Sequence, residues 1–324
     1  RNEDRFHNHS RVTASNSYAY RQAANGDAMH GRGPVSAAHP FETGRFLLQG
    51  SAVMAMCGIL LLFLMIIAFA LPVFAESGTG GPFSWVWAPG QGRFGILPML
   101  TGSLLAASLA IAMGWPLAFC FCAWLLCPAP GIGPVRRALR RFAGALVRLM
   151  TAIPTVVYGF AAVFLLAPVI RQGLGGSGLC WLTASLMLSL LILPTIVLVL
   201  LAGLGARLDA VALPGAALGL SRLELLWNVV LPQARGTLLA SAVLGFGRAV
   251  GDTMLPLMLA GNATIVPDSV LSSIRTLTAH MAMVTANEVG GAAYQSLFMA
   301  GLFLLVINAA VSLGIRRIAR GGTR

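Results

Sequence analysis

Six long apolar segments constrain this chain more than any other feature of its sequence. Each is long enough to cross a bilayer, which takes about 20 residues in a helix. The apolar runs are continuous rather than alternating, and backbone polar groups in lipid must be paired within the segment. We therefore predict an all-α integral membrane protein with six transmembrane helices. The segments cover roughly 46–74, 95–126, 142–169, 181–204, 234–261 and 292–315.

The composition supports a membrane protein and excludes several other classes. Charged residues make up only 10% of the 324 residues, whereas a soluble domain carries about 25%. The net charge of +12 is carried entirely by arginine. The arginines do not form the single basic face that nucleic-acid binding needs. The sequence has no Walker A loop, nucleotide fingerprint or hydrolytic triad. We expect no catalytic residue and no cofactor bound by this chain, so energy must come from a partner or an ion gradient.

The distribution of arginine predicts the orientation of the chain in the membrane. Residues 1–45, the second and fourth loops and the C-terminus hold seventeen arginines, against three in the other loops. By the positive-inside rule both termini are cytoplasmic. Residues 1–45 are polar and lack hydrophobic periodicity, which is typical of a disordered tail, while 46–324 forms the transmembrane domain. The scattered histidines of the tail predict no metal site.

Two charged residues stand inside the fifth apolar segment. Arg248 and Asp252 are four residues apart, so in a continuous helix they share one face. Charges at mid-span are costly and typically mark a transport pathway, although a structural ion pair that locks helices together is the alternative. Gly247 and Gly251 form a small-xxx-small pair that favours close helix packing beside this site.

Proline interrupts the third apolar segment. Pro154 lacks an amide hydrogen and disturbs the carbonyl group four residues earlier, that of Met150. Such breaks are tolerated where protein or a water-filled path pairs the backbone. Thr155 and Tyr158 add hydroxyl groups nearby. This pattern fits a transport pathway or a simple packing kink. Similar breaks are expected at Pro116, Pro194 and Pro256.

The fourth loop, 205–233, mixes apolar and charged residues in a helical pattern. Pro214 could begin a short helix there and Pro232 could end one. Periodicity alone leaves two interpretations, a helix that docks on a partner protein and a helix that lies on the lipid surface. The apolar positions at helical spacing are Leu220, Leu223, Leu226 and Trp227.

The segment "ALGLSRLELLWNVVLP" within this loop resembles the coupling loop of ABC-importer permeases. Gly219 and the pair Leu231–Pro232 match the family pattern, in which a glycine precedes Leu-Pro by about a dozen residues. The acidic residue that usually opens the motif is Leu213 here. The resemblance implies a cytoplasmic coupling helix that contacts an ATPase subunit. The residues assigned to that contact are Gly219, Ser221, Arg222, Glu224, Leu231 and Pro232.

Four further segments are similar to the phosphate-specific branch of these permeases, and to its PstC-type members in particular. They are "AIPTVVYGF" (152–160), "GFGRAVGDTMLPLMLAGN" (245–262), "GRFGILPMLTGSLL" (92–105) and "RTLTAH…ANEVGGA" (275–292). Two positions depart from the family pattern. Asp252 stands where glutamate is common, and Arg148 lies near a position that often carries a carboxylate.

The resemblance implies a type I importer architecture in the bacterial inner membrane and an ATP-driven uptake of inorganic phosphate. The expected partners are a second, PstA-like permease, two ATPase subunits and a periplasmic phosphate-binding protein, with ATP and Mg²⁺ on the ATPases. Alternatives are an importer of another oxyanion such as molybdate or sulfate, and a gradient-driven carrier or channel. The expected pathway residues are Arg248, Asp252, Pro154, Thr155 and Tyr158.

Overall fold

The computed structural model describes residues 40–76, 83–128, 133–287 and 292–321. Contacts divide the chain into a unit Arg1–Leu60 and a unit Leu61–Arg324, and the sites described below lie wholly in the second. Most of the predicted tail, residues 1–39, lies outside the described residues, and α2 (Pro40–Glu76) begins within the last part of it. The predicted disorder of the tail therefore stays a prediction.

The described residues are mostly helical, which confirms the predicted all-α class. Five helical segments are long and apolar enough to cross a membrane. A sixth results if the pair Arg222–Gln233 and Arg235–Gly251, bent by 80°, is one span. Apart from the helices, a hairpin pairs β1 (Trp87–Ala88) with β2 (Arg93–Phe94). The five spanning segments are Leu47–Leu71, Leu97–Leu126, Thr155–Leu174, Trp181–Ala217 and Ser296–Gly314.

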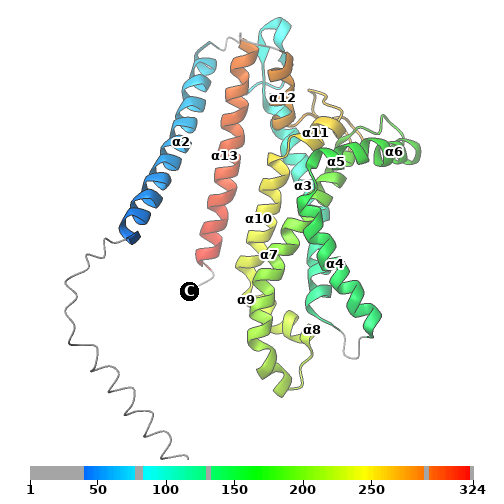
Figure 1. The fold of residues 1–324 in the computed structure, drawn as a ribbon. Helices are drawn as coiled ribbons and strands as arrows, with labels where there is room; N and C mark the ends of the chain where they lie inside the picture. The colour runs from blue at the N-terminus through cyan, green and yellow to red at the C-terminus, as the bar shows by residue number, and fades with distance from the viewer. Residues whose placement is uncertain (1–39, 77–82, 129–132, 288–291, 322–324) are drawn as a thin grey trace, which may run out of the picture. The chain divides into compact units, whose positions relative to one another are not determined.

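Three helices form the core of the larger unit. α3 (Leu97–Leu126), α7 (Trp181–Ala217) and α10 (Arg235–Gly251) pack against one another (Figure 1). α7 contributes a row of buried side chains at every fourth position, which is the spacing that keeps residues on one helix face. The row consists of Leu188, Ile192, Ile196, Leu200, Leu204 and Leu208.

The prolines of α3 and α7 do not interrupt these helices. Pro116 lies inside α3 and Pro194 lies inside α7, so the expectation that they break their spans is wrong. A membrane helix tolerates proline where neighbouring helices support it, and α3 and α7 pack against each other. Pro256 lies within the short helix α11 (Met254–Leu259), which begins after a break at Asp252.

The third and fifth apolar segments are each divided into shorter helices. α4 (Pro134–Ala152) is followed by α5 (Thr155–Ala161), a π-helical turn at Ala162–Leu166 and α6 (Ala167–Leu174). After α10 and α11 the chain continues to α12 (Leu277–Asn287) and α13 (Ala292–Gly321). The π-helical turn ends two residues before Pro168. Its altered hydrogen bonding accommodates the proline, which a regular helix accommodates poorly.

The predicted fourth loop is largely helical. α7 continues past residue 204 to Ala217, so Pro214 lies within α7 and does not begin a short helix. A separate helical segment follows from Arg222 to Gln233 and ends one residue after Pro232. It consists of α8 (Arg222–Leu225), a π-helical turn at Leu226–Val230 and α9 (Leu231–Gln233).

Candidate functional site

The break between α4 and α5 lies at Ile153 and Pro154, whose backbones are extended with ψ of 127° and 140°. The helix is therefore interrupted at Pro154, and not merely kinked, and the spanning segment Thr155–Leu174 begins directly after the break. The Tyr158 hydroxyl donates a hydrogen bond of 3.0 Å to the carbonyl oxygen of Met150, the group that proline deprives of its partner. Thr155 is the first residue of α5. A tyrosine of α5 thus pairs the carbonyl group that the break leaves open near the end of α4.

The break between α10 and α11 lies at Asp252. α10 ends at Gly251, and Asp252 has an extended backbone with φ −74° and ψ 132°. Its Oδ2 accepts a hydrogen bond of 2.8 Å from the Leu255 amide. Aspartate competes with the backbone in this way and so favours helix caps over helix interiors. The expectation that Arg248 and Asp252 share a helix face is therefore wrong, and no ion pair within 4.0 Å joins these two described residues.

A segment distant in sequence supplies a hydrogen bond at the break at Asp252. The Thr278 hydroxyl donates a hydrogen bond of 2.8 Å to the Asp252 carbonyl oxygen. The amide of Leu277 donates a hydrogen bond of 2.7 Å to Ser103 on α3. The chain that follows α11 thus returns into the bundle and pairs the backbone group that the break would leave open.

The two half-helices that follow the breaks pack against each other. A β-carbon at Gly159 of α5 would lie only 2.6 Å from the Met258 sulfur of α11. The absence of a side chain at Gly159 therefore permits the contact between α5 and α11. The two breaks, which lie in separate segments of the sequence, lead into elements that are neighbours in the fold.

Arg248 lines a pocket of about 580 Å³ between α7, α10 and α13. Its side chain is exposed within the described chain, and no described carboxylate forms an ion pair with it. Of the predicted pathway residues, Arg248 alone lines this pocket; Asp252, Pro154, Thr155 and Tyr158 do not. The lining residues are Thr195, Ala240, Val243, Leu244, Gly247, Arg248, Asn308, Val311 and Ser312.

The close helix contact of α10 lies at Gly245, which the sequence analysis did not single out for packing. A β-carbon there would lie 2.7 Å from Ile196 Cδ1 and 2.9 Å from Ile111 Cδ1. At Gly247 it would lie 3.6 Å from Asn308 Oδ1, and at Gly251 it would meet no described atom within 4 Å. The close contact expected at Gly247 and Gly251 is therefore not made within the described chain.

A glycine ends α7 and a capping box begins α8. Gly219 has φ +73°, a conformation that glycine adopts without steric cost. Its amide bonds to Ala216 and the next amide to Gly215, the pattern of a Schellman motif. Ser221 and Glu224 then cap each other reciprocally. Hydrogen bonds from the Ser221 amide, and then from its hydroxyl, lower the pKa of the Glu224 carboxyl below its usual value.

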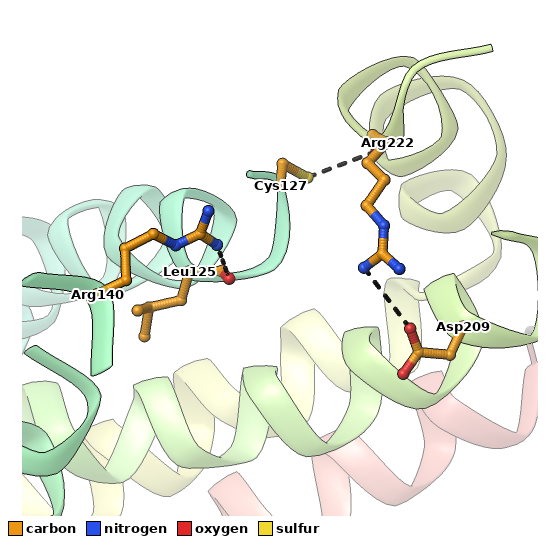
Figure 2. A network of polar contacts seen from close by, with 5 residues as sticks. All are labelled: Leu125, Cys127, Arg140, Asp209 and Arg222. Carbon is orange, nitrogen blue, oxygen red and sulfur yellow. Dashed lines mark hydrogen bonds and ion pairs between the residues drawn. The ribbon is translucent and has the colours of Figure 1, made fainter. Parts of the chain in front are cut away.

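Polar contacts join α8 to the ends of α3 and α7 (Figure 2). Arg222 lies 3.8 Å from the Asp209 carboxylate of α7, measured from Nη1 to Oδ1. The Cys127 thiol, at the end of α3, donates to the Arg222 carbonyl oxygen at 3.5 Å. Arg140 of α4 donates to the Leu125 carbonyl oxygen. The segment that contains Arg222 is thus linked to helices that form the core.

The apolar residues of the segment 220–233 divide into a buried and an exposed set. Leu226 is fully buried, as is its neighbour Leu225, whereas Leu223 and Trp227 are 50% and 53% exposed. The predicted apolar stripe therefore does not lie on one face. The π-helical turn that begins at Leu226 shifts the helical period, which accounts for the change. Leu213, where an acidic residue was expected, is also exposed.

The sequence of residues 132–322 matches the model of the family described as binding-protein-dependent transport system inner membrane component. The match covers more than half of the chain and includes both breaks and the segment 220–233. The chain belongs to this family. It is accordingly a permease subunit of an ABC importer and a multi-pass protein of the inner membrane.

Relatives of this permease subunit cover most of its length. The phosphate transport system permease protein PstC of Pasteurella multocida is 28% identical over 262 residues, which are 74% of this chain and 79% of the relative. The probable phosphate transport system permease protein PstC of Methanocaldococcus jannaschii is 24% identical over 286 residues, or 79% of this chain and 87% of the relative. The resemblance to phosphate-transporter permeases is thus confirmed as a likeness in sequence.

Solved ABC transporters share the fold of this permease subunit. A chain of the MetNI methionine transporter, in an inward-facing conformation, aligns with a TM-score of 0.52 at 17% identity, covering 71% of this chain and 94% of that one. A bacterial importer of the acidic polysaccharide alginate aligns with a TM-score of 0.58 at 14% identity, covering 87% and 98%. These alignments confirm the predicted type I importer fold.

Proposed function

We propose that this permease subunit imports inorganic phosphate. The observation that carries the proposal is Arg248, a guanidinium group that forms no ion pair within 4.0 Å in the described chain, in a pocket between three helices. The PstC relatives named above support phosphate as the substrate. Phosphate offers the charge and the acceptor oxygens that a guanidinium group binds by charge-assisted hydrogen bonds.

In this proposal Asp252 does not act as a counter-charge that competes with phosphate for Arg248. Its Oδ2 accepts a hydrogen bond from the Leu255 amide, and no ion pair within 4.0 Å joins it to Arg248 in the described chain. It ends α10 one turn after Arg248 and begins α11. Asp252 therefore shapes the pathway by interrupting the helix that carries Arg248, while Pro154, Thr155 and Tyr158 shape the second interruption.

The segment 220–233 couples this permease subunit to a cytoplasmic ATPase in the proposed transporter. The exposed Leu223 and Trp227 offer apolar surface, and Gly219 and the Ser221–Glu224 capping box fix where the segment begins. A second permease subunit and a second ATPase complete the membrane assembly, and a periplasmic binding protein delivers phosphate. ATP and Mg²⁺ bind to the ATPases. The arginine distribution supports cytoplasmic termini.

Uptake by the assembled transporter in proteoliposomes tests the substrate. We expect ATP-dependent phosphate uptake that Arg248→Gln abolishes, whereas Arg171→Gln, at the end of α6, leaves uptake unchanged. Uptake of sulfate or molybdate in place of phosphate would reassign the substrate. Phosphate uptake that persists without ATP would identify a gradient-driven carrier and contradict the proposal.

A substitution at Gly219 tests the coupling contact. Gly219→Leu places a side chain in a left-handed conformation that costs about 1–2 kcal/mol and adds bulk at the start of the docking segment. We expect ATP hydrolysis to continue while phosphate uptake falls. Gly144→Leu, on α4 with no described neighbour within 4 Å, is the control. Normal uptake by the Gly219 variant would show that this segment is not the ATPase contact.

A further inference from the structure

Asn308 of α13 brings an amide group to the pocket that Arg248 lines. Its Oδ1 faces α10 at Gly247, where it would lie 3.6 Å from a β-carbon if that residue had one. Because Gly247 has no side chain, the Asn308 oxygen is not covered by α10 at this point. Thr195 of α7 and Ser312, one turn further along α13, supply the other polar groups of the lining.

A backbone contact fixes the direction of this amide group. Nδ2 of Asn308 donates a hydrogen bond of 3.0 Å to the Leu304 carbonyl oxygen, one turn earlier in α13. The amide nitrogen is therefore held against its own helix, and Oδ1 projects on the opposite side of the group. Among the described residues, no donor is bonded to Oδ1. The pocket thus combines a cation, Arg248, with an acceptor that lacks a donor.

These two groups suit some oxyanions better than others. Sulfate and molybdate carry no hydrogen at neutral pH, so each of their oxygens repels an acceptor. Phosphate keeps one or two hydroxyl groups at neutral pH, and each of these is a donor. A site built to receive a substrate hydroxyl group rejects analogues that lack it, because its own polar atom is then left unpaired.

We propose that Asn308, together with Arg248, forms a subsite for a tetrahedral oxyanion that still carries a proton. Oδ1 of Asn308 accepts a hydrogen bond from the anion's hydroxyl group, and Arg248 binds its charged oxygens. This inference rests on the proposed phosphate import. It adds a second step of substrate selection, located in the membrane-spanning subunit. Asn308 is a specificity-determining residue in this account.

Anion-induced stabilisation of the purified transporter, without its binding protein, tests the subsite. A ligand that binds the folded state raises the unfolding temperature, and the stabilisation grows with the logarithm of the ligand concentration divided by Kd. We expect inorganic phosphate to stabilise the wild-type transporter at concentrations about tenfold lower than sulfate. In Asn308→Leu, and in the smaller Asn308→Ala, we expect phosphate and sulfate to act at similar concentrations.

Thr285→Val is the matched control. Thr285 also bonds to a carbonyl oxygen one turn earlier, that of Met281, but it lies on α12 outside the pocket. The control should keep the preference for phosphate. A preference that survives in both Asn308 variants, or that is absent in the wild-type transporter, overturns the role of Asn308 while phosphate import still stands. Phosphate stabilisation and uptake that persist in Arg248→Gln would overturn the role of Arg248, whereas uptake of sulfate or molybdate in place of phosphate by the wild-type transporter would contradict the proposed function itself.

Discussion

Two apolar segments of this permease subunit, 142–169 and 234–261, are divided by breaks, and the two breaks are stabilised in different ways. At Pro154 the hydrogen bonding is local: proline has no amide hydrogen to offer to the Met150 carbonyl oxygen, and the Tyr158 hydroxyl donates to it instead. At Asp252 the break involves the aspartate side chain, whose Oδ2 accepts a hydrogen bond from the Leu255 amide. Thr278, 26 residues later, then pairs the Asp252 carbonyl oxygen. The first break is stabilised within its own segment, whereas the second combines a local contact with a hydrogen bond from a distant segment.

The difference matters because both breaks lead into helices that pack together. α5 and α11 meet at Gly159 and Met258, so the elements that follow the two breaks share an interface. Discontinuous membrane helices often surround substrate sites in transporters. Changes at one break are therefore expected to reach the other through this interface, and four experiments address this comparison.

The largest effect is expected from exchanging the two charges of the fifth span. Arg248→Asp combined with Asp252→Arg should leave phosphate uptake reduced on the order of a hundredfold, since hydrogen bonds to a charged group are worth about 1.5–3 kcal/mol each. The helix ends between the two positions, so the exchange restores no native ion pair. Initial uptake rates at matched membrane levels measure the effect. Recovery to the wild-type rate would mean that the pair acts as a helix clamp.

A bulky residue at Gly159 should separate the two half-helices. Gly159→Leu forces its β-carbon toward the Met258 sulfur, and overpacking of this kind costs about 1–3 kcal/mol. We expect a lower unfolding temperature of the purified transporter and slower uptake. Gly173→Leu, on α6 with no described neighbour within 4 Å, is the control. Equal stability of the two variants would argue that α5 and α11 do not depend on each other.

Two substitutions at Asp252 separate its capping role from its charge. Asp252→Ala removes the acceptor of the Leu255 amide and should cost about 0.5–2 kcal/mol of stability, as loss of a helix cap does. Asp252→Asn keeps an oxygen at the same position, so it should retain most of that stability. Thermal unfolding of both variants measures the difference. A drop of equal size in both would indicate that the charge, and not the cap, holds the break.

The smallest effect is expected at the first break. Tyr158→Phe removes the hydrogen bond to Met150 and should cost about 1 kcal/mol. In a Pro154→Ala background the restored amide can serve Met150, so the same change should cost less. A double-mutant cycle on the unfolding temperature measures this coupling. Additive effects of the two substitutions would show that Tyr158 does not compensate for the proline.

Hydropathy predicted the spans well where lipid is the main constraint. The second span was expected at 95–126 and α3 runs from Leu97 to Leu126, because the need to pair backbone groups in lipid is local. The end of α7 was missed by thirteen residues. Hydropathy falls after residue 204, but nothing ends the helix before Gly219 adopts a left-handed conformation. Loss of hydrophobicity marks the edge of the membrane and not the end of a helix.

The candidate site could be predicted only in part. Arg248 stood out because a charge in an apolar segment is costly, but its neighbours in the pocket come from helices distant in sequence. Asn308 is an amide within the last apolar segment, a signal that could have been used. The break after Gly251 could not be predicted, since it depends on Thr278. Gly245, not Gly247, makes the close contact because its neighbours are Ile111 and Ile196.

The length of α7 has a mechanical consequence. Its 37 residues make a rod of about 55 Å at 1.5 Å per residue, nearly twice the roughly 30 Å thickness of the hydrocarbon core. Thr195 in the pocket wall and Asp209 beside Arg222 are both carried by this rod. A tilt of about 5° applied at one end displaces the other by roughly 5 Å. We therefore expect α7 to act as a lever, through which a small movement outside the bilayer would change the width of the pocket that Thr195 lines.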